Sequence, residues 1–300
     1  MFKNEYLRFV LMTGLLVLQA TGVSAKGRSG SGRSLTDRDL LGVWKLTKFV
    51  VTEIGKSEQE WCQGANGTVA YLPGKMTVSI NCESTEPGSS AEKIGGLLFY
   101  SGPFEVDSVK GEVIHRVRNY SDPSLNNVYR RKVEKVGDNF LRLSGALGEG
   151  KEVVLEWIRD EKFQYDANPL TGYWELVGSE NEVPGEVGKV PFCSGFYGSI
   201  LYTPGGYAAV SINCGEKADT SVEEPADRFG RRYFYSGDYE FENDTIVQTP
   251  FNASEVSQIG KPVIRKMKIE KDYLILEGTN GSKFKATWRK AGSFTGLTKK

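Results

Sequence analysis

The chain has one histidine, His115, and the pattern around it predicts an inward-facing position. In Val113-Ile-His115-Arg-Val117, residues two apart lie on the same side of a strand, so the imidazole shares a face with two valines. An imidazole with a pKa near neutrality can hydrogen-bond a ligand or act as a general acid or base. The alternative is a core histidine whose hydrogen bonds are all made within the protein. Gln248 takes the corresponding place in the second half of the chain, which favours hydrogen bonding over proton transfer.

Four tyrosines could offer hydroxyl groups to the same ligand. Tyr71 and Tyr100 in the first half of the chain correspond to Tyr202 and Tyr235 in the second half. A tyrosine can pack its ring in a core while its hydroxyl group reaches a polar partner, so core packing alone explains these positions equally well. We treat the four tyrosines, together with the histidine and the glutamine, as ligand-binding candidates and assign no catalytic residue.

Other kinds of chemistry have less support in the sequence. A single histidine and the absence of a Cys-x-x-Cys pair argue against a metal site, and no phosphate-binding fingerprint points to a nucleotide, so we expect no metal and no cofactor. The Ser-Gly pairs at Ser101 and Ser236 are typical of a bulge or turn. A role as nucleophiles is unsupported, since no histidine in the second half could activate Ser236. Lys plus Arg and Asp plus Glu number 38 each, which leaves no net charge to attract nucleic acid.

These candidates lie in a sequence that repeats itself. Cys62-Gln-Gly, Tyr71-Leu-Pro-Gly and Val78-Ser-Ile-Asn-Cys82 recur in the same order as Cys193-Ser-Gly, Tyr202-Thr-Pro-Gly and Val210-Ser-Ile-Asn-Cys214. Each copy is far longer than the roughly 20–50 residues of a solenoid repeat, so the chain contains two copies of one globular domain. We predict a signal peptide at 1–25, a flexible leader at 26–36, domains at 37–162 and 170–292, a linker at 163–169 and a tail at 293–300.

Alternating polarity predicts that both copies are built from strands. From Lys75 to Cys82 the even-numbered residues are apolar and the odd-numbered residues polar, which is typical of a half-buried strand. Pro73-Gly74 and Pro204-Gly205 predict turns in which the glycine supplies a positive φ. Further strands are expected at 97–100, 111–117, 128–136, 140–144 and 153–158, and at 233–235, 245–248, 263–269, 273–277 and 284–288. Many short strands without helical periodicity predict an all-β fold, an antiparallel barrel or sandwich.

The N-terminus and the cysteines predict export. An apolar run from Phe9 to about Gly22, followed by Val23-Ser-Ala25, is typical of a signal peptide and is too short for a stable membrane span. In an oxidising compartment, secreted or periplasmic, the four cysteines are expected to pair within each copy as Cys62–Cys82 and Cys193–Cys214. In a eukaryotic host, glycans could attach at five sequons, Asn66, Asn119, Asn243, Asn252 and Asn280.

An ordered set of motifs, present twice, resembles the lipocalin-like domain family. It comprises Gly42-Val-Trp44 and Gly172-Tyr-Trp174, the two Tyr-x-Pro-Gly hairpins, the two Tyr-Ser-Gly segments and the closing strands that end Trp157-Ile-Arg159 and Trp288-Arg-Lys290. The resemblance implies two tandem antiparallel β-barrels, each with one open end. It also implies structural roles for Trp44 and Trp174, with a basic residue of the last strand, Arg159, over the first ring. The second copy departs from this pattern because Lys290 stands in place of an arginine.

The sequence leaves the function open between three hypotheses. We favour an exported protein whose barrels bind a small, largely apolar molecule, with His115 or Gln248 among a few polar anchors. The first alternative, from family analogy, is a cofactor-free cyclase or isomerase that folds a hydrophobic substrate into a reactive geometry. The second is a structural or adhesive exported protein whose barrels are filled by side chains.

Overall fold

The computed structural model describes most of both repeats. It covers residues 34–53, 55–85, 87, 95–135, 139–148, 150–160, 168–180, 192–193, 195–216, 230–279 and 284–293. The predicted signal peptide, most of the leader, most of the linker and nearly all of the tail lie outside the described residues.

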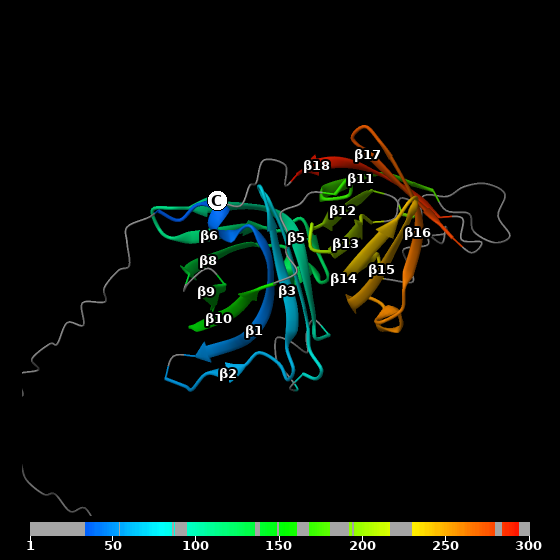
Figure 1. The fold of residues 1–300 in the computed structure, drawn as a ribbon. Helices are drawn as coiled ribbons and strands as arrows, with labels where there is room; N and C mark the ends of the chain where they lie inside the picture. Colours follow the sequence, from blue (N-terminus) through cyan, green and yellow to red (C-terminus); the bar gives the residue numbers. More distant parts are fainter. Residues whose placement is uncertain are drawn as a thin grey trace, which may run out of the picture. The chain divides into compact units, whose positions relative to one another are not determined.

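The first repeat is a closed antiparallel barrel of eight strands, drawn from blue to green in Figure 1. Strand β10 pairs with β1, with Trp44 opposite Arg159 and Val51 opposite Val153, and this pairing closes the barrel. Helix α1, Asp37–Leu40, precedes it, and short strands β2, Gln59–Glu60, and β7, Asn119–Tyr120, flank it, with the 3₁₀ turn η1 at Pro123–Leu125. The barrel strands are β1 Gly42–Glu53, β3 Asn66–Leu72, β4 Lys75–Asn81, β5 Leu97–Asp107, β6 Glu112–Arg116, β8 Val128–Lys135, β9 Phe140–Gly148 and β10 Lys151–Arg159.

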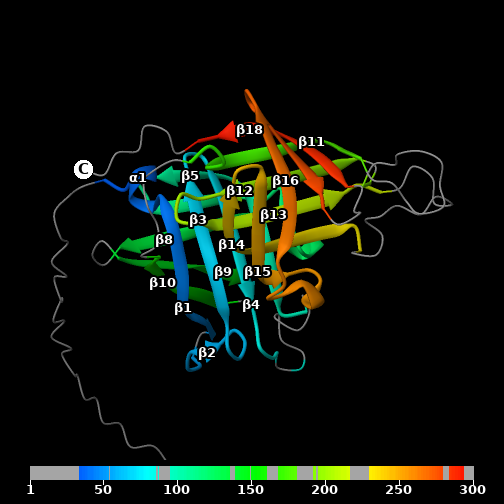
Figure 2. The same ribbon diagram turned by 45° about the vertical axis from the view of Figure 1, so that its right-hand side comes forward.

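The second repeat closes in the same way (Figure 1; Figure 2). Its register matches the first, because Gly172 pairs with Tyr202 as Gly42 pairs with Tyr71. Its strands are β11 Gly172–Glu180, β12 Phe196–Tyr202, β13 Tyr207–Cys214, β14 Arg232–Glu242, β15 Thr245–Ala253, β16 Val263–Glu270, β17 Tyr273–Gly278 and β18 Lys285–Gly292, with a 3₁₀ turn η3 at Val256–Gln258. The predicted fold class, two tandem antiparallel β-barrels, is confirmed.

The two Pro-Gly turns differ in length. In the first barrel Leu72 pairs with Lys75, and Gly74 has the predicted positive φ of 69°. In the second barrel β12 ends at Tyr202 and β13 begins at Tyr207, and the positive φ of 84° lies at Gly206. The prediction for Gly205 was therefore wrong, because the longer loop moves the left-handed position one residue along. The bulge expected at Ser236-Gly237 is confirmed by a register shift between β14 and β15.

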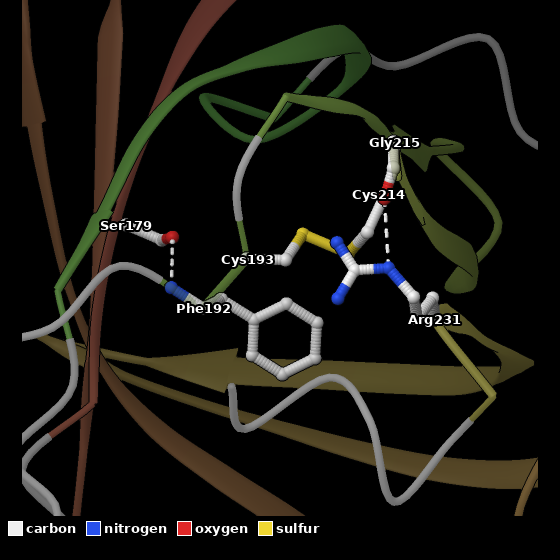
Figure 3. Close-up of a disulfide and its surroundings, with 6 residues drawn as sticks. All are labelled: Ser179, Phe192, Cys193, Cys214, Gly215 and Arg231. Atoms are coloured by element: carbon white, nitrogen blue, oxygen red, sulfur yellow. Dashed lines mark hydrogen bonds between the residues drawn. A yellow bond between two sulfur atoms is a disulfide. The ribbon is translucent and has the colours of Figure 1, made fainter. Parts of the chain in front are cut away.

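Both predicted disulfides are present, Cys62–Cys82 and Cys193–Cys214. Figure 3 shows the second of them with Phe192 and Arg231 beside it. Arg231 has a positive φ of 63°, and its Nε donates a hydrogen bond of 2.7 Å to the Gly215 carbonyl. The arginine therefore ties together the chain on either side of the segment that leads from β13 to β14.

Each barrel has a tryptophan at the start of its first strand, fully buried beneath a basic side chain. The Trp44 Nε1 donates to the Leu40 carbonyl at 2.7 Å, and the Arg159 guanidinium carbon lies 4.0 Å from the centre of the ring. In the second barrel the Trp174 Nε1 donates to the Leu170 carbonyl at 2.8 Å, and the Lys290 Nζ lies 5.2 Å from the ring centre. Both contacts have cation–π geometry.

The barrels pack against each other through the outer faces of β1, β3 and β5 in the first barrel and of β11 to β14 in the second. An apolar cluster joins Val43, Ala70, Leu72 and Phe99 to Tyr173, Leu201, Tyr207, Ala209 and Phe234. Beside it lies a polar seam of six buried side chains, Ser79, Ser101, Asn119, Ser199, Ser236 and Asn252. Ser79 Oγ lies 2.8 Å from Ser236 Oγ, and Asn119 Nδ2 donates to Ser199 Oγ at 3.1 Å.

This packing changes two expectations from the sequence. Strand β4 is buried on both faces from Met76 to Ile80, so the prediction of a half-buried strand was wrong, because the second barrel covers its polar face. Asn119 and Asn252 are also buried in the polar seam. A glycan therefore has no room at either sequon in the folded protein.

Candidate functional site

The first barrel contains a buried Tyr-His-Tyr triad that joins three of the candidate residues. His115 on β6 is 1% exposed, and its Nε2 lies 2.8 Å from the Tyr71 hydroxyl oxygen. Its Nδ1 lies 3.1 Å from the Tyr100 hydroxyl oxygen. Both ring nitrogens therefore have partners within the protein, as expected of a core histidine with a complete hydrogen-bond network.

The second barrel repeats this arrangement with glutamine in place of histidine. The Tyr235 hydroxyl donates to Gln248 Oε1 at 2.6 Å, and Gln248 Nε2 donates to the Tyr202 oxygen at 3.2 Å. Glutamine offers one acceptor and one donor to the two tyrosines, as a neutral imidazole does. By this equivalence Tyr100 donates to Nδ1 of His115, and the proton on Nε2 is donated to Tyr71.

Burial keeps both triads uncharged. The pKa of His115 falls to about 3, chiefly because burial disfavours the charged ring, and the nearby Arg131 charge lowers it further. Burial raises the pKa of the Tyr71 and Tyr100 hydroxyls, so both remain protonated. A neutral histidine with two tyrosine partners has no free nitrogen for proton transfer, and its position suits it to fix the two tyrosine side chains.

A cavity of about 150 Å³ opens inside the first barrel next to this triad. Its wall on β1 and β10 includes Phe49 and Leu155. These two residues pair with each other further along the strands, toward the end of the barrel away from Trp44. Tyr100 and His115 reach the cavity, together with Ser124, Tyr129 and Arg131. The rest of the lining is apolar: Phe49, Trp61, Val69, Val78, Ile80, Leu98, Leu125, Leu143, Leu147, Val153, Leu155 and Trp157.

The second barrel has larger side chains at some of the corresponding positions and smaller ones at others, such as Ala286 in place of Leu155. Its counterpart of Val153 is Phe284, and its counterpart of Leu98 is Tyr233. A separate hollow of about 270 Å³ borders Tyr233, but neither Gln248 nor its two tyrosine partners line it. Of the six predicted ligand-binding residues, Tyr100 and His115 thus lie at the apolar cavity, Tyr71 lies behind the histidine, and Tyr202, Tyr235 and Gln248 form the triad of the other barrel.

Arg131 at the cavity wall was not among the predicted site residues. Its side chain is 7% exposed, and among the residues that the structure describes it is the only buried Lys, Arg, Asp or Glu. The sequence does contain a signal for it, because Tyr129, Arg131 and Val133 alternate with Arg130 and Lys132 along one strand. The second barrel places Arg265 at the corresponding position of β16.

Two absences hold for the described part of the chain. Its side chains include no group of three or more His, Cys, Asp and Glu that could hold a metal ion. None of its helices is both long enough and apolar enough to cross a membrane.

The fold defines the chain as a tandem antiparallel β-barrel protein. Residues 171–297 match the lipocalin-like domain family. The matched residues make up the second barrel, and the first barrel repeats its motifs, register and closure, so the chain is similar to a tandem lipocalin-like domain protein. A comparison with curated proteins found no match.

Two solved structures have weak similarity to the chain. A protein of unknown function of the DUF3598 family, from Nostoc punctiforme PCC 73102, is 8% identical, with 84% of this chain and 97% of that chain covered and a TM-score of 0.23. A Bacteroides fragilis NCTC 9343 protein, provisionally assigned to the outer membrane, is 8% identical, with 85% and 98% covered and a TM-score of 0.22. Scores this low support no conclusion about this chain.

Proposed function

We propose that this protein binds a small, largely apolar molecule in the cavity of its first barrel. The observation that supports the proposal is the cavity of about 150 Å³ with an apolar wall interrupted by a few polar groups. Ligand sites in proteins share this composition. An apolar cavity of this volume can hold a group the size of benzene, and because the cavity is not enclosed a longer chain can extend out of it. His115 and the two tyrosines would hold the polar part of the wall in a fixed shape for the ligand.

The proposal is specific to the first barrel. In the second barrel the Phe284 ring lies 5.1 Å from the guanidinium carbon of Arg265. The first barrel has the smaller Val153 at the corresponding position, beside Arg131 in the cavity wall. The two barrels therefore differ by side-chain volume at a matched site, and this difference provides a test.

Replacing Val153 with phenylalanine should close the cavity with the side chain that the second barrel already uses. We expect the affinity for octan-1-ol, measured by isothermal titration calorimetry, to fall at least about tenfold. The added ring removes room for two methylene groups of the ligand, and burying each contributes about 0.8 kcal/mol to the binding free energy. Their loss together lowers the affinity about tenfold or more. The matched control, Phe284→Val, leaves the first barrel intact and should preserve that affinity. A folded Val153→Phe variant that binds octan-1-ol like the wild type would refute the proposal.

We also propose that the protein works outside the cytoplasm. Its two disulfides support an oxidising compartment. The N-terminal sequence supports a signal peptide that ends at Ala25. N-terminal sequencing of the protein purified from its own host should therefore find Lys26 as the first residue, and a mature chain that retains Phe9 to Gly22 would contradict the proposal.

A further inference from the structure

We propose that the ligand of the first barrel carries a carboxylate and that Arg131 binds it. This inference rests on the proposed function and narrows it to amphiphilic monoanions, molecules with an apolar body and one acidic head group. It comes from a buried charge in the cavity wall whose counter-ion is missing among the described residues.

The guanidinium of Arg131 is a permanent charge in an apolar place. An arginine does not lose its proton in a protein, and the isolated charge is expensive to bury without a partner. Among the described residues its hydrogen bonding is limited to one contact, from Nη1 to the Arg130 carbonyl at 3.3 Å. The Tyr129 ring adds a cation–π contact, with its centre 5.0 Å from the guanidinium carbon. No described carboxylate lies within ion-pair distance, so the charge is available to an anion in the cavity.

The barrel makes room for this side chain with a glycine. A Cβ atom at Gly145 on β9 would lie 2.8 Å from Nη1 of Arg131 and 2.7 Å from the Arg130 carbonyl oxygen. The second barrel uses the same combination, because Arg265 pairs with Gly278 across strands β16 and β17. There the Arg265 Nη1 donates to the Ile264 carbonyl at 3.0 Å, and the Phe284 ring covers the guanidinium. The first barrel retains the arginine with Val153 in place of Phe284, and the ring beside its guanidinium is that of Tyr129 on the same strand.

The two tyrosine hydroxyls in the cavity wall already have hydrogen-bond partners within the protein, so Arg131 is the group that can bind the head group of the ligand. The Tyr129 hydroxyl donates to the Leu125 carbonyl at 3.3 Å, and the Tyr100 hydroxyl is bonded to His115. A planar carboxylate fits the fork of N–H groups that a guanidinium presents. One buried cation balances one negative charge, and the apolar lining suits a hydrocarbon body rather than a free inorganic anion.

The test compares two ligands that differ only in the head group, octanoate and octan-1-ol. By isothermal titration calorimetry at pH 7.5, the wild type should bind octanoate at least about tenfold more tightly, since a hydrogen bond to a charged group contributes roughly 1.5–3 kcal/mol. Arg131→Gln should lose this preference and still bind octan-1-ol. Gly145→Ala, which keeps the charge and displaces the Arg131 side chain together with the Arg130 carbonyl that it contacts, should weaken octanoate binding more than octan-1-ol binding. Arg130→Gln is the matched control, because that neighbour lies near Glu112, with 3.6 Å between Arg130 Nη1 and Glu112 Oε2, and should leave both affinities unchanged.

The possible failures can be told apart. If the wild type binds octan-1-ol as tightly as octanoate, or folded Arg131→Gln retains the preference, the carboxylate proposal is overturned and the apolar cavity stands. If the wild type binds neither ligand, the proposed function fails and this inference fails with it. Thermal unfolding of each variant shows whether it is folded, and a folded Gly145→Ala protein provides the same test if Arg131→Gln does not fold.

Discussion

Replacing His115 with alanine is expected to lower the free energy of unfolding of the first barrel by roughly 3–5 kcal/mol. The substitution leaves a cavity and removes the partner of both the Tyr71 and the Tyr100 hydroxyl, which are buried with it. Glutamine should be tolerated at a cost of about 1 kcal/mol, because Gln248 already bridges the same two tyrosine positions in the second barrel. Urea unfolding of the two variants measures this difference, and an equal loss for both would refute the bridging role.

The same pair of proteins should differ in their response to acid. Folded His115 resists protonation down to a pKa of about 3, whereas the unfolded chain takes up the proton near pH 6.5. Unfolding therefore binds a proton, and the stability of the folded wild type falls as the pH drops below 6.5. Between pH 7 and pH 5 this contribution is roughly 2 kcal/mol.

The comparison isolates His115 from the other groups that titrate in this range. Tyr71 and Tyr100 contact the ring, and because burial raises the pKa of both hydroxyls they stay neutral between pH 7 and pH 5 and add nothing to the difference. His115→Gln should lack this 2 kcal/mol loss while all other titrations remain. Parallel pH dependences for the wild type and His115→Gln would show that the histidine is not held neutral.

The second large effect concerns the contact between the barrels. Phe234→Ala should cost roughly 3–5 kcal/mol, since it empties a core position that is 3% exposed. The ring stacks on Phe99 of the other barrel with centres 4.9 Å apart. We expect calorimetry to show one coupled unfolding transition for the wild type and two separate transitions for the variant.

A control for this experiment lies on the same strand. Phe241 is 36% exposed, and Phe241→Ala should leave both the midpoint and the coupling nearly unchanged. Phe99→Ala should resemble Phe234→Ala, and the double variant should lose less than the sum of the two, because each single change already breaks the stacking contact. Two independent transitions in the wild type would show that the barrels are not coupled through this pair.

The alternation of polar and apolar residues predicted most of the barrel strands, and the repeat predicted the disulfide partners. The periodicity could not predict what covers the outer faces. Thr77 and Ser79 belong to the polar side of β4, yet both are buried, since the facing surface comes from a segment more than 100 residues away. Polarity along a strand tells which residues share a face, and the environment of that face depends on tertiary packing.

The residues of the candidate site were likewise predicted only in part from the sequence. His115 and Tyr100 were found because an isolated histidine and repeated tyrosines stand out in the sequence. Arg131 lies between Arg130 and Lys132, and such a run of basic residues is typical of a solvated surface. Its burial depends on the room left by Gly145 on the neighbouring strand, and a cavity depends on volumes such as that of Val153. The alternation with Tyr129 and Val133 shows only which face Arg131 shares, so neither its burial nor the cavity could be predicted without the packing of the barrel.

Phe99 and Phe234 occupy the same position in the two repeats, and they stack on each other. A position that meets its own equivalent lies on or near a two-fold axis, as in the isologous interface of a symmetric dimer. Ser101 and Ser236, and Asn119 and Asn252, likewise enter the polar seam from both repeats. The molecule is thus a dimer-like pair made by one polypeptide. Its pairing does not depend on protein concentration, and the face that a single barrel would use to bind a copy of itself is already occupied.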